Sequence, residues 1–94
     1  MKTYFVHLTI REDTVGEYVI GTYESDDYAT ARAKYDGLCA GNFREKEKTL
    51  YDRLFERKAR TPSLKLTVYL TEAEMDEEDE LGDSRCLDRY SLIA

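Results

Sequence analysis

The chain has 94 residues, of which 41% are hydrophobic and 36% charged, and its formal net charge is −6. This length fits one domain, and the composition is typical of a folded protein rather than a disordered one. No apolar run reaches the about 18 residues that a membrane span needs, and the first residues lack a signal peptide's apolar stretch, so we expect one cytoplasmic globular domain over residues 1–94.

The first half of the chain predicts a β-hairpin followed by a helix. Apolar and polar side chains alternate over residues 3–11, and residues 17–24 are rich in β-branched and aromatic side chains. The segment 13–16 between them has turn composition. Ser25 or Asp26 is suited to begin a helix, whose apolar residues recur at three- and four-residue steps as far as Cys39 before Gly41 and Asn42.

The second half predicts another helix and two more strands. Residues 43–60 show a helical apolar stripe that ends before Pro62, although the pattern leaves open whether Gly41 separates two helices or kinks one. Residues 64–71 alternate strictly, which predicts a strand at the centre of the core. Thr71 and Glu74 match a capping box, which predicts a short helix ended by Gly82, and residues 87–93 resemble a last strand.

Together these elements predict an α+β fold. The expected order is ββααβ(α)β, and it contains no repeated βαβ unit. We therefore expect a small antiparallel sheet of about four strands, with the helices packed on one face.

Charge is distributed unevenly along the chain. Residues 1–42 hold four bases and seven acids, residues 43–65 eight bases and four acids, and residues 66–94 two bases and nine acids. An acidic region of this kind repels phosphate backbones, so direct binding of nucleic acid is not expected. In residues 43–60 the acids are interspersed among the bases, which favours an ordinary solvated helix surface over a phosphate site.

The most unusual feature is a block of seven carboxylates within residues 72–80, without a base among them. A calcium loop with Gly82 at its sixth position would need ligands where Leu81 and Arg85 stand, so the template fails and no metal site is predicted. We expect the acidic segment 72–83 to bind a partner. The residues assigned to this role are Glu72, Glu74, Asp76, Glu77, Glu78, Asp79, Glu80 and Asp83.

Other residues that could take part in catalysis or metal binding are assigned structural roles. His7 is the sole histidine and is expected on the surface, because zinc and triad sites need partners that the sequence lacks. Cys39 and Cys86 are expected to be buried, reduced thiols. The five glycines match neither phosphate-loop nor dinucleotide spacing, so no cofactor is predicted. Four tyrosines are expected around the helices, mainly as packing residues: Tyr23, Tyr28, Tyr35 and Tyr51.

These observations predict a non-enzymatic protein-binding module whose acidic surface docks on a basic protein. Enzymes that handle nucleic acid are the obvious class of basic partner. By analogy of size and charge, viruses and mobile elements encode small acidic inhibitors of such enzymes, anti-CRISPR proteins among them. Two alternatives stay open: a small carboxylate-based, metal-dependent enzyme, and a homo-oligomeric structural subunit joined through a sheet edge.

Overall fold

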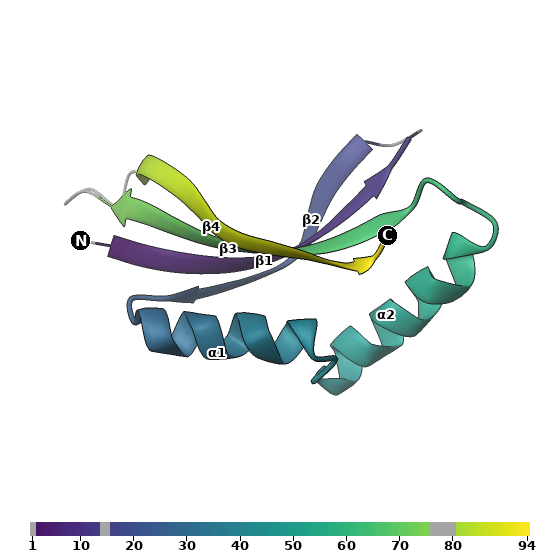
Figure 1. The fold of residues 1–94 in the computed structure, drawn as a ribbon, viewed down its shortest axis with the longest axis horizontal. Helices are drawn as coiled ribbons and strands as arrows, with labels where there is room; N and C mark the ends of the chain where they lie inside the picture. Colours follow the sequence, from purple (N-terminus) through teal and green to yellow (C-terminus); the bar gives the residue numbers. More distant parts are fainter. Residues whose placement is uncertain (1, 14–15, 76–80) are drawn as a thin grey trace.

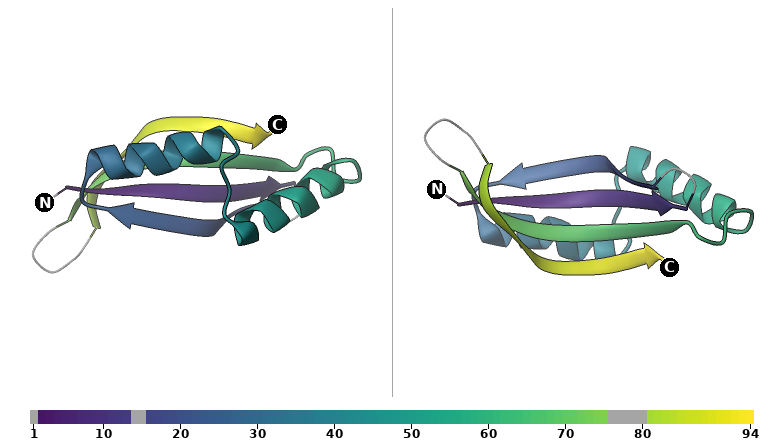
Figure 2. Two further views of the ribbon diagram at one scale, coloured as in Figure 1. Left: turned by 90° about the horizontal axis from the view of Figure 1, so that it is seen from below. Right: turned by 90° about the horizontal axis from the view of Figure 1, so that it is seen from above.

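A computed structural model describes residues 2–13, 16–75 and 81–94 of the chain. Its elements are β1 (Lys2–Glu12), β2 (Gly16–Ser25), α1 (Tyr28–Cys39), α2 (Glu45–Lys58), β3 (Lys65–Met75) and β4 (Leu81–Ile93). Within the described residues the strands form one antiparallel sheet in the order β2-β1-β3-β4. Both helices lie on one face of this sheet, and no described helix covers the other face (Figure 1, Figure 2). The predicted α+β fold class is confirmed.

The core lies between the two central strands and α1. Alternation turns every second side chain of β1 and β3 towards the helices. Val68 of β3 is 0% exposed and Leu66 is 3% exposed, which confirms that this strand lies at the centre of the core. The other buried apolar residues of the cluster are Val6, Leu8, Ile10, Ala31, Tyr35, Leu38, Leu54, Leu64, Leu70 and Ile93.

The ends of α1 are fixed by local chemistry. The N-cap is Asp27, one or two residues after the predicted caps, and its carboxylate accepts hydrogen bonds from Thr30 N at 3.1 Å and Thr30 Oγ1 at 2.6 Å. Ser25 Oγ in turn accepts from Asp27 N. Gly41 has a φ of 84°, a left-handed conformation that suits glycine and ends the helix. Gly41 therefore separates two helices rather than kinking one.

Helix α2 is less deeply packed than α1 and extends beyond it beneath the far end of the sheet (Figure 1). Leu54 is buried, whereas the neighbouring Phe55 is 63% exposed. Polar contacts help to hold the helix, because Lys58 Nζ donates a hydrogen bond to the Leu64 carbonyl oxygen at 2.9 Å in the segment that leads into β3. Neither described helix has the length and apolar character needed to cross a membrane.

The short helix predicted from Thr71 is wrong over residues 71–75, which continue β3. In this central strand Thr71 pairs with Phe5 of β1 and Cys86 of β4, and Ala73 is 1% exposed. Pairing on both sides satisfies the backbone, and this tertiary context overrides the local capping signal. Gly82 lies inside β4 rather than ending a helix, so the last strand begins at Leu81 instead of residue 87. The remainder of the predicted helix, residues 76–80, lies outside the described residues.

Strand β4 forms an irregular edge of the sheet. Leu66 pairs with Ile93 and Thr67 with Ser91, so Leu92 is an extra residue in β4; Leu87 is inserted in the same way. Both leucines pack against the core cluster. Bulges of this kind bend an edge strand and make it a poor template for adding another strand. The geometry of β4 therefore disfavours the alternative of a subunit joined through this edge.

Candidate functional site

The acidic segment belongs to one end of the sheet. Met75 at the end of β3 pairs with Leu81 at the start of β4, so the five acidic residues 76–80 form the connection between two paired strands. Of the other predicted docking residues, Glu74 lies in β3 and Asp83 in β4. Residues 76–80 lie outside the described residues, and their contribution rests on their charge in the sequence. The antiparallel register thus brings the acids before and after the connection to the same end of an elongated molecule of 46 × 28 × 19 Å.

Glu72, one of the predicted docking residues, lies between two cations. Its Oε1 lies 3.5 Å from Lys2 Nζ and 3.7 Å from Arg85 Nη2, and its side chain is 18% exposed. These two cations come from β1 and β4, the strands that flank β3. Glu72 therefore has a structural role between strands, and its negative charge is offset within the protein.

The described residues contain no group of three or more His, Cys, Asp or Glu side chains arranged to hold a metal ion. The acids of 76–80 are not part of that search. Of the described acids, Asp36 and Asp88 both contact Arg32, at 3.2 Å each, which joins α1 to β4. Their positions are explained by this ion-pair network.

His7 lies on the open face of the sheet and is half-buried. Its ring stacks on Phe5 with centroids 5.7 Å apart, and Nδ1 is 3.3 Å from Thr22 Oγ1 in the neighbouring strand. Burial lowers the pKa of the imidazole, so the neutral ring is favoured. Packing against Phe5 and the contact with Thr22 therefore explain the position of His7. Its predicted surface location is confirmed in part, because the side chain is half-buried.

The two cysteines differ in their surroundings. Both are free; Cys39 is half-buried and Cys86 is exposed. The prediction of two buried thiols is wrong for Cys86, because this residue shares the uncovered face of the sheet with its register partner Thr71. Cys39 continues the three- and four-residue apolar spacing of α1, which indicated that it faces the core. The sequence around Cys86 has no such pattern, so nothing local indicated its burial.

Charged side chains at the surface of α2 form local contacts within the protein. Lys48 pairs with Asp52 at 2.9 Å, and Glu47 accepts hydrogen bonds from both Lys34 Nζ and Arg44 N. These contacts support the interpretation of this helix surface as a solvated one with local ion pairs.

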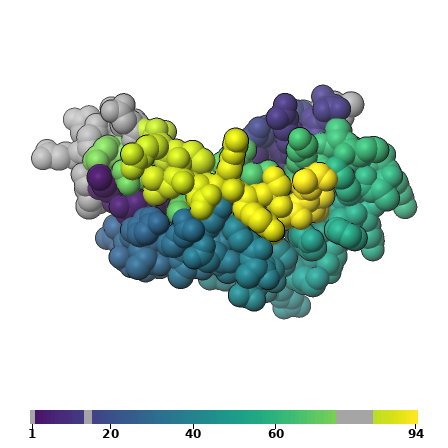
Figure 3. All heavy atoms as spheres, in the orientation of Figure 1, coloured from purple at the N-terminus to yellow at the C-terminus, as the bar shows by residue number. Residues whose placement is uncertain are grey.

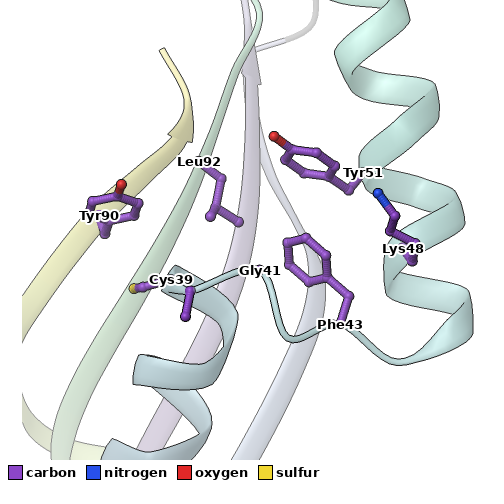
Figure 4. Close-up of a pocket in the computed structure, with 8 residues that line it drawn as sticks. Cys39, Gly41, Phe43, Lys48, Tyr51, Tyr90 and Leu92 are labelled. Carbon is purple, nitrogen blue, oxygen red and sulfur yellow. The ribbon is translucent and has the colours of Figure 1, made fainter.

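An aromatic groove separates α2 from β4. Phe43 stacks on Tyr51 with centroids 5.1 Å apart, and Tyr51 stacks on Phe55 at 6.1 Å. Figure 4 shows Phe43 and Tyr51 facing Leu92 of β4 across a hollow of about 320 Å³.

The four tyrosines expected around the helices take different positions: Tyr35 is 4% exposed, Tyr23 and Tyr51 are half-buried, and Tyr28 is 45% exposed. The expected packing role is strongest for Tyr35.

Comparison with known proteins adds no family to these observations. No protein-family model, curated protein or solved structure matches the chain.

Proposed function

We propose that this protein is a non-enzymatic binding module whose acidic end docks on a basic surface of another protein. The observation that carries the proposal is the pairing of Met75 with Leu81, which brings the strand segments that contain Glu74 and Asp83 to one end of the sheet. The five acids of residues 76–80 follow Met75 and precede Leu81 in the sequence. Like charges gathered at one end repel each other, and this repulsion is relieved when a basic surface approaches.

The partner class follows from charge. Proteins that handle nucleic acid present broad basic surfaces to bind phosphate backbones, and an acidic segment can occupy the same surface. We propose inhibition of such an enzyme as the consequence of docking, in the manner of the small acidic inhibitors encoded by viruses and mobile elements. Glu72 is paired with Lys2 and Arg85, so the proposal rests on the charge of the five acids between the two strands: Asp76, Glu77, Glu78, Asp79 and Glu80.

The test compares the parent with a variant in which residues 76–80 are changed to Asn or Gln. A partner is first captured from nuclease-treated host lysate on the immobilised parent, and its association rate is then measured for both proteins over a salt series. The neutral variant should associate at least several-fold more slowly at low salt. The difference should shrink at physiological ionic strength, where exposed charges are screened beyond about 8 Å. Activity of a captured enzyme should fall as the parent is added.

A matched control carries Lys46→Gln and Arg53→Gln, two exposed changes on α2. This control should keep the parent's association rate, because the proposal places docking at the other end of the molecule. Equal association rates for the parent and the neutral variant at low salt would show that the acidic segment is an ordinary solvated surface with no role in docking. A greater loss in the α2 control would transfer the binding role to the helix.

A further inference from the structure

The uncovered face of the sheet contains a basic hollow that the acidic end does not explain. Its volume is about 250 Å³, and residues of all four strands line it. Figure 3 shows the upper side of the molecule hollowed between β4 and the raised end of the β1–β2 hairpin, and Figure 2 shows that the helices lie behind this face. The hollow is therefore open to a ligand from solvent.

Three cations line this hollow: Arg11 of β1, Lys65 of β3 and Arg89 of β4. Arg11 and Lys65 are direct partners in the β1–β3 register. Like charges at opposed positions destabilise a sheet, so this pair lowers the stability of the protein unless an anion lies between them. Within the described part of the chain, none of these three side chains forms an ion pair with a carboxylate.

Glu17 of β2 is the carboxylate of the lining and the register partner of Arg11. The hollow therefore has an excess of two positive charges in a protein whose net charge is −6. A concave surface concentrates the field of such charges and attracts an anion of matching size.

Hydroxyl groups form a row beside these cations. Thr9 pairs with Thr67, and Thr67 pairs with Ser91, so three strands contribute neighbouring hydroxyls to the lining. Tyr69 lines the hollow in the next row, where its register partner is Arg89. Guanidinium and ammonium groups donate hydrogen bonds to anionic oxygens, and hydroxyls add neutral donors. This donor set fits a tetrahedral anion, which presents several oxygens in different directions.

We propose that the open face binds a small molecule bearing a phosphate monoester, with Arg11, Lys65 and Arg89 contacting the phosphate group. An extended nucleic acid is disfavoured because the acidic end of the same sheet would repel its backbone. The hollow lies around the start of β3 and carries positive charge, whereas the acidic docking site follows the end of β3, so either proposal can fail without the other.

The test is an NMR titration of the labelled protein with inorganic phosphate and with phenyl phosphate, against chloride at equal ionic strength. Both phosphates should give saturable shifts at the amides of Arg11, Thr67 and Arg89. Lys65→Gln and Arg89→Gln should each weaken binding by about tenfold, as expected for loss of a charge-assisted hydrogen bond. Lys46→Gln, an exposed change on α2, should leave binding at the parent's value.

A stability measurement separates loss of binding from loss of folding. In chloride, Lys65→Gln should melt at or above the parent's temperature, because it removes the repulsion with Arg11. Phosphate should raise the melting temperature of the parent more than that of Lys65→Gln at the same phosphate concentration. Shifts that grow linearly at every exposed base, or a saturable response to an acidic peptide but not to phosphate, would overturn the proposal.

Discussion

Arg57 of α2 forms an ion pair with a buried carboxylate at the end of β1. Its Nη2 lies 2.7 Å from Glu12 Oε1 and 3.0 Å from Oε2, while the Glu12 side chain is 2% exposed and that of Arg57 is 50% exposed. The two residues are 45 positions apart in sequence. This contact fixes the outer helix to the sheet where few apolar residues do so.

Removal of Arg57 should therefore leave a buried charge without its partner. We expect Arg57→Gln to destabilise the protein by about 2 kcal/mol, less than the cost for a fully buried pair because Arg57 is half-exposed. Urea denaturation gives the free energy of unfolding. The matched control, Arg53→Gln one turn earlier, should stay within about 0.5 kcal/mol of the parent. Equal losses for both variants would mean that the pair has no special role, and the double variant Glu12→Gln/Arg57→Gln measures the coupling energy.

The centre of the core gives a second prediction. Leu66→Ala and Val68→Ala should each destabilise the protein by about 2–4 kcal/mol, because they remove buried methyl groups and leave a cavity. Val19→Ala supplies the control, since Val19 is 54% exposed and should lose less than about 0.5 kcal/mol. Thermal and urea unfolding should rank the variants in this order. A core variant as stable as Val19→Ala would contradict the burial of that side chain.

His7 should give the protein a pH-dependent stability above the range in which carboxylates titrate. Burial lowers its pKa in the folded state, so the unfolded chain, with a pKa of about 6.5, binds the proton more readily. The contribution of His7 to the free energy of unfolding is fully present above that pH. It should decline as the pH falls from about 7 towards 5. His7→Gln should flatten the curve in this window. An unchanged slope in the variant would show that another group causes this pH dependence of stability. Asp27 does not titrate in this window, because hydrogen bonds from Thr30 lower its pKa.

The two thiols should react at different rates. Cys86 is exposed, whereas Cys39 is half-buried and burial raises the pKa of its thiol, which reduces the fraction present as the reactive thiolate. With Ellman's reagent at pH 8 we expect one fast and one slow phase, which merge in denaturant. Cys86→Ser should remove the fast phase and Cys39→Ser the slow one. Retention of the fast phase in Cys86→Ser would reverse the assignment.

The sequence by itself determined the elements whose signals are local. Alternation over residues 64–71 predicted the central strand, and the helical spacing up to Cys39 predicted α1, because side-chain periodicity follows directly from backbone geometry. Composition also identified the acidic segment, since charge is visible without knowledge of the fold. These patterns were sufficient for the α+β class and for helices on one face of an antiparallel sheet.

Tertiary structure decided which side chains meet. Thr71 and Glu74 carry a local capping signal, yet pairing of β3 with strands on both sides extends the strand to Met75. Glu12 lies between the predicted strand 3–11 and the predicted turn segment 13–16, and only the fold brings it to Arg57 of α2. The same register opposes Arg11 and Lys65, which are 54 positions apart and carry no shared motif. Contacts of this kind depend on register, bulges and helix placement, which arise from packing of the whole chain and leave no periodic signal in any one segment.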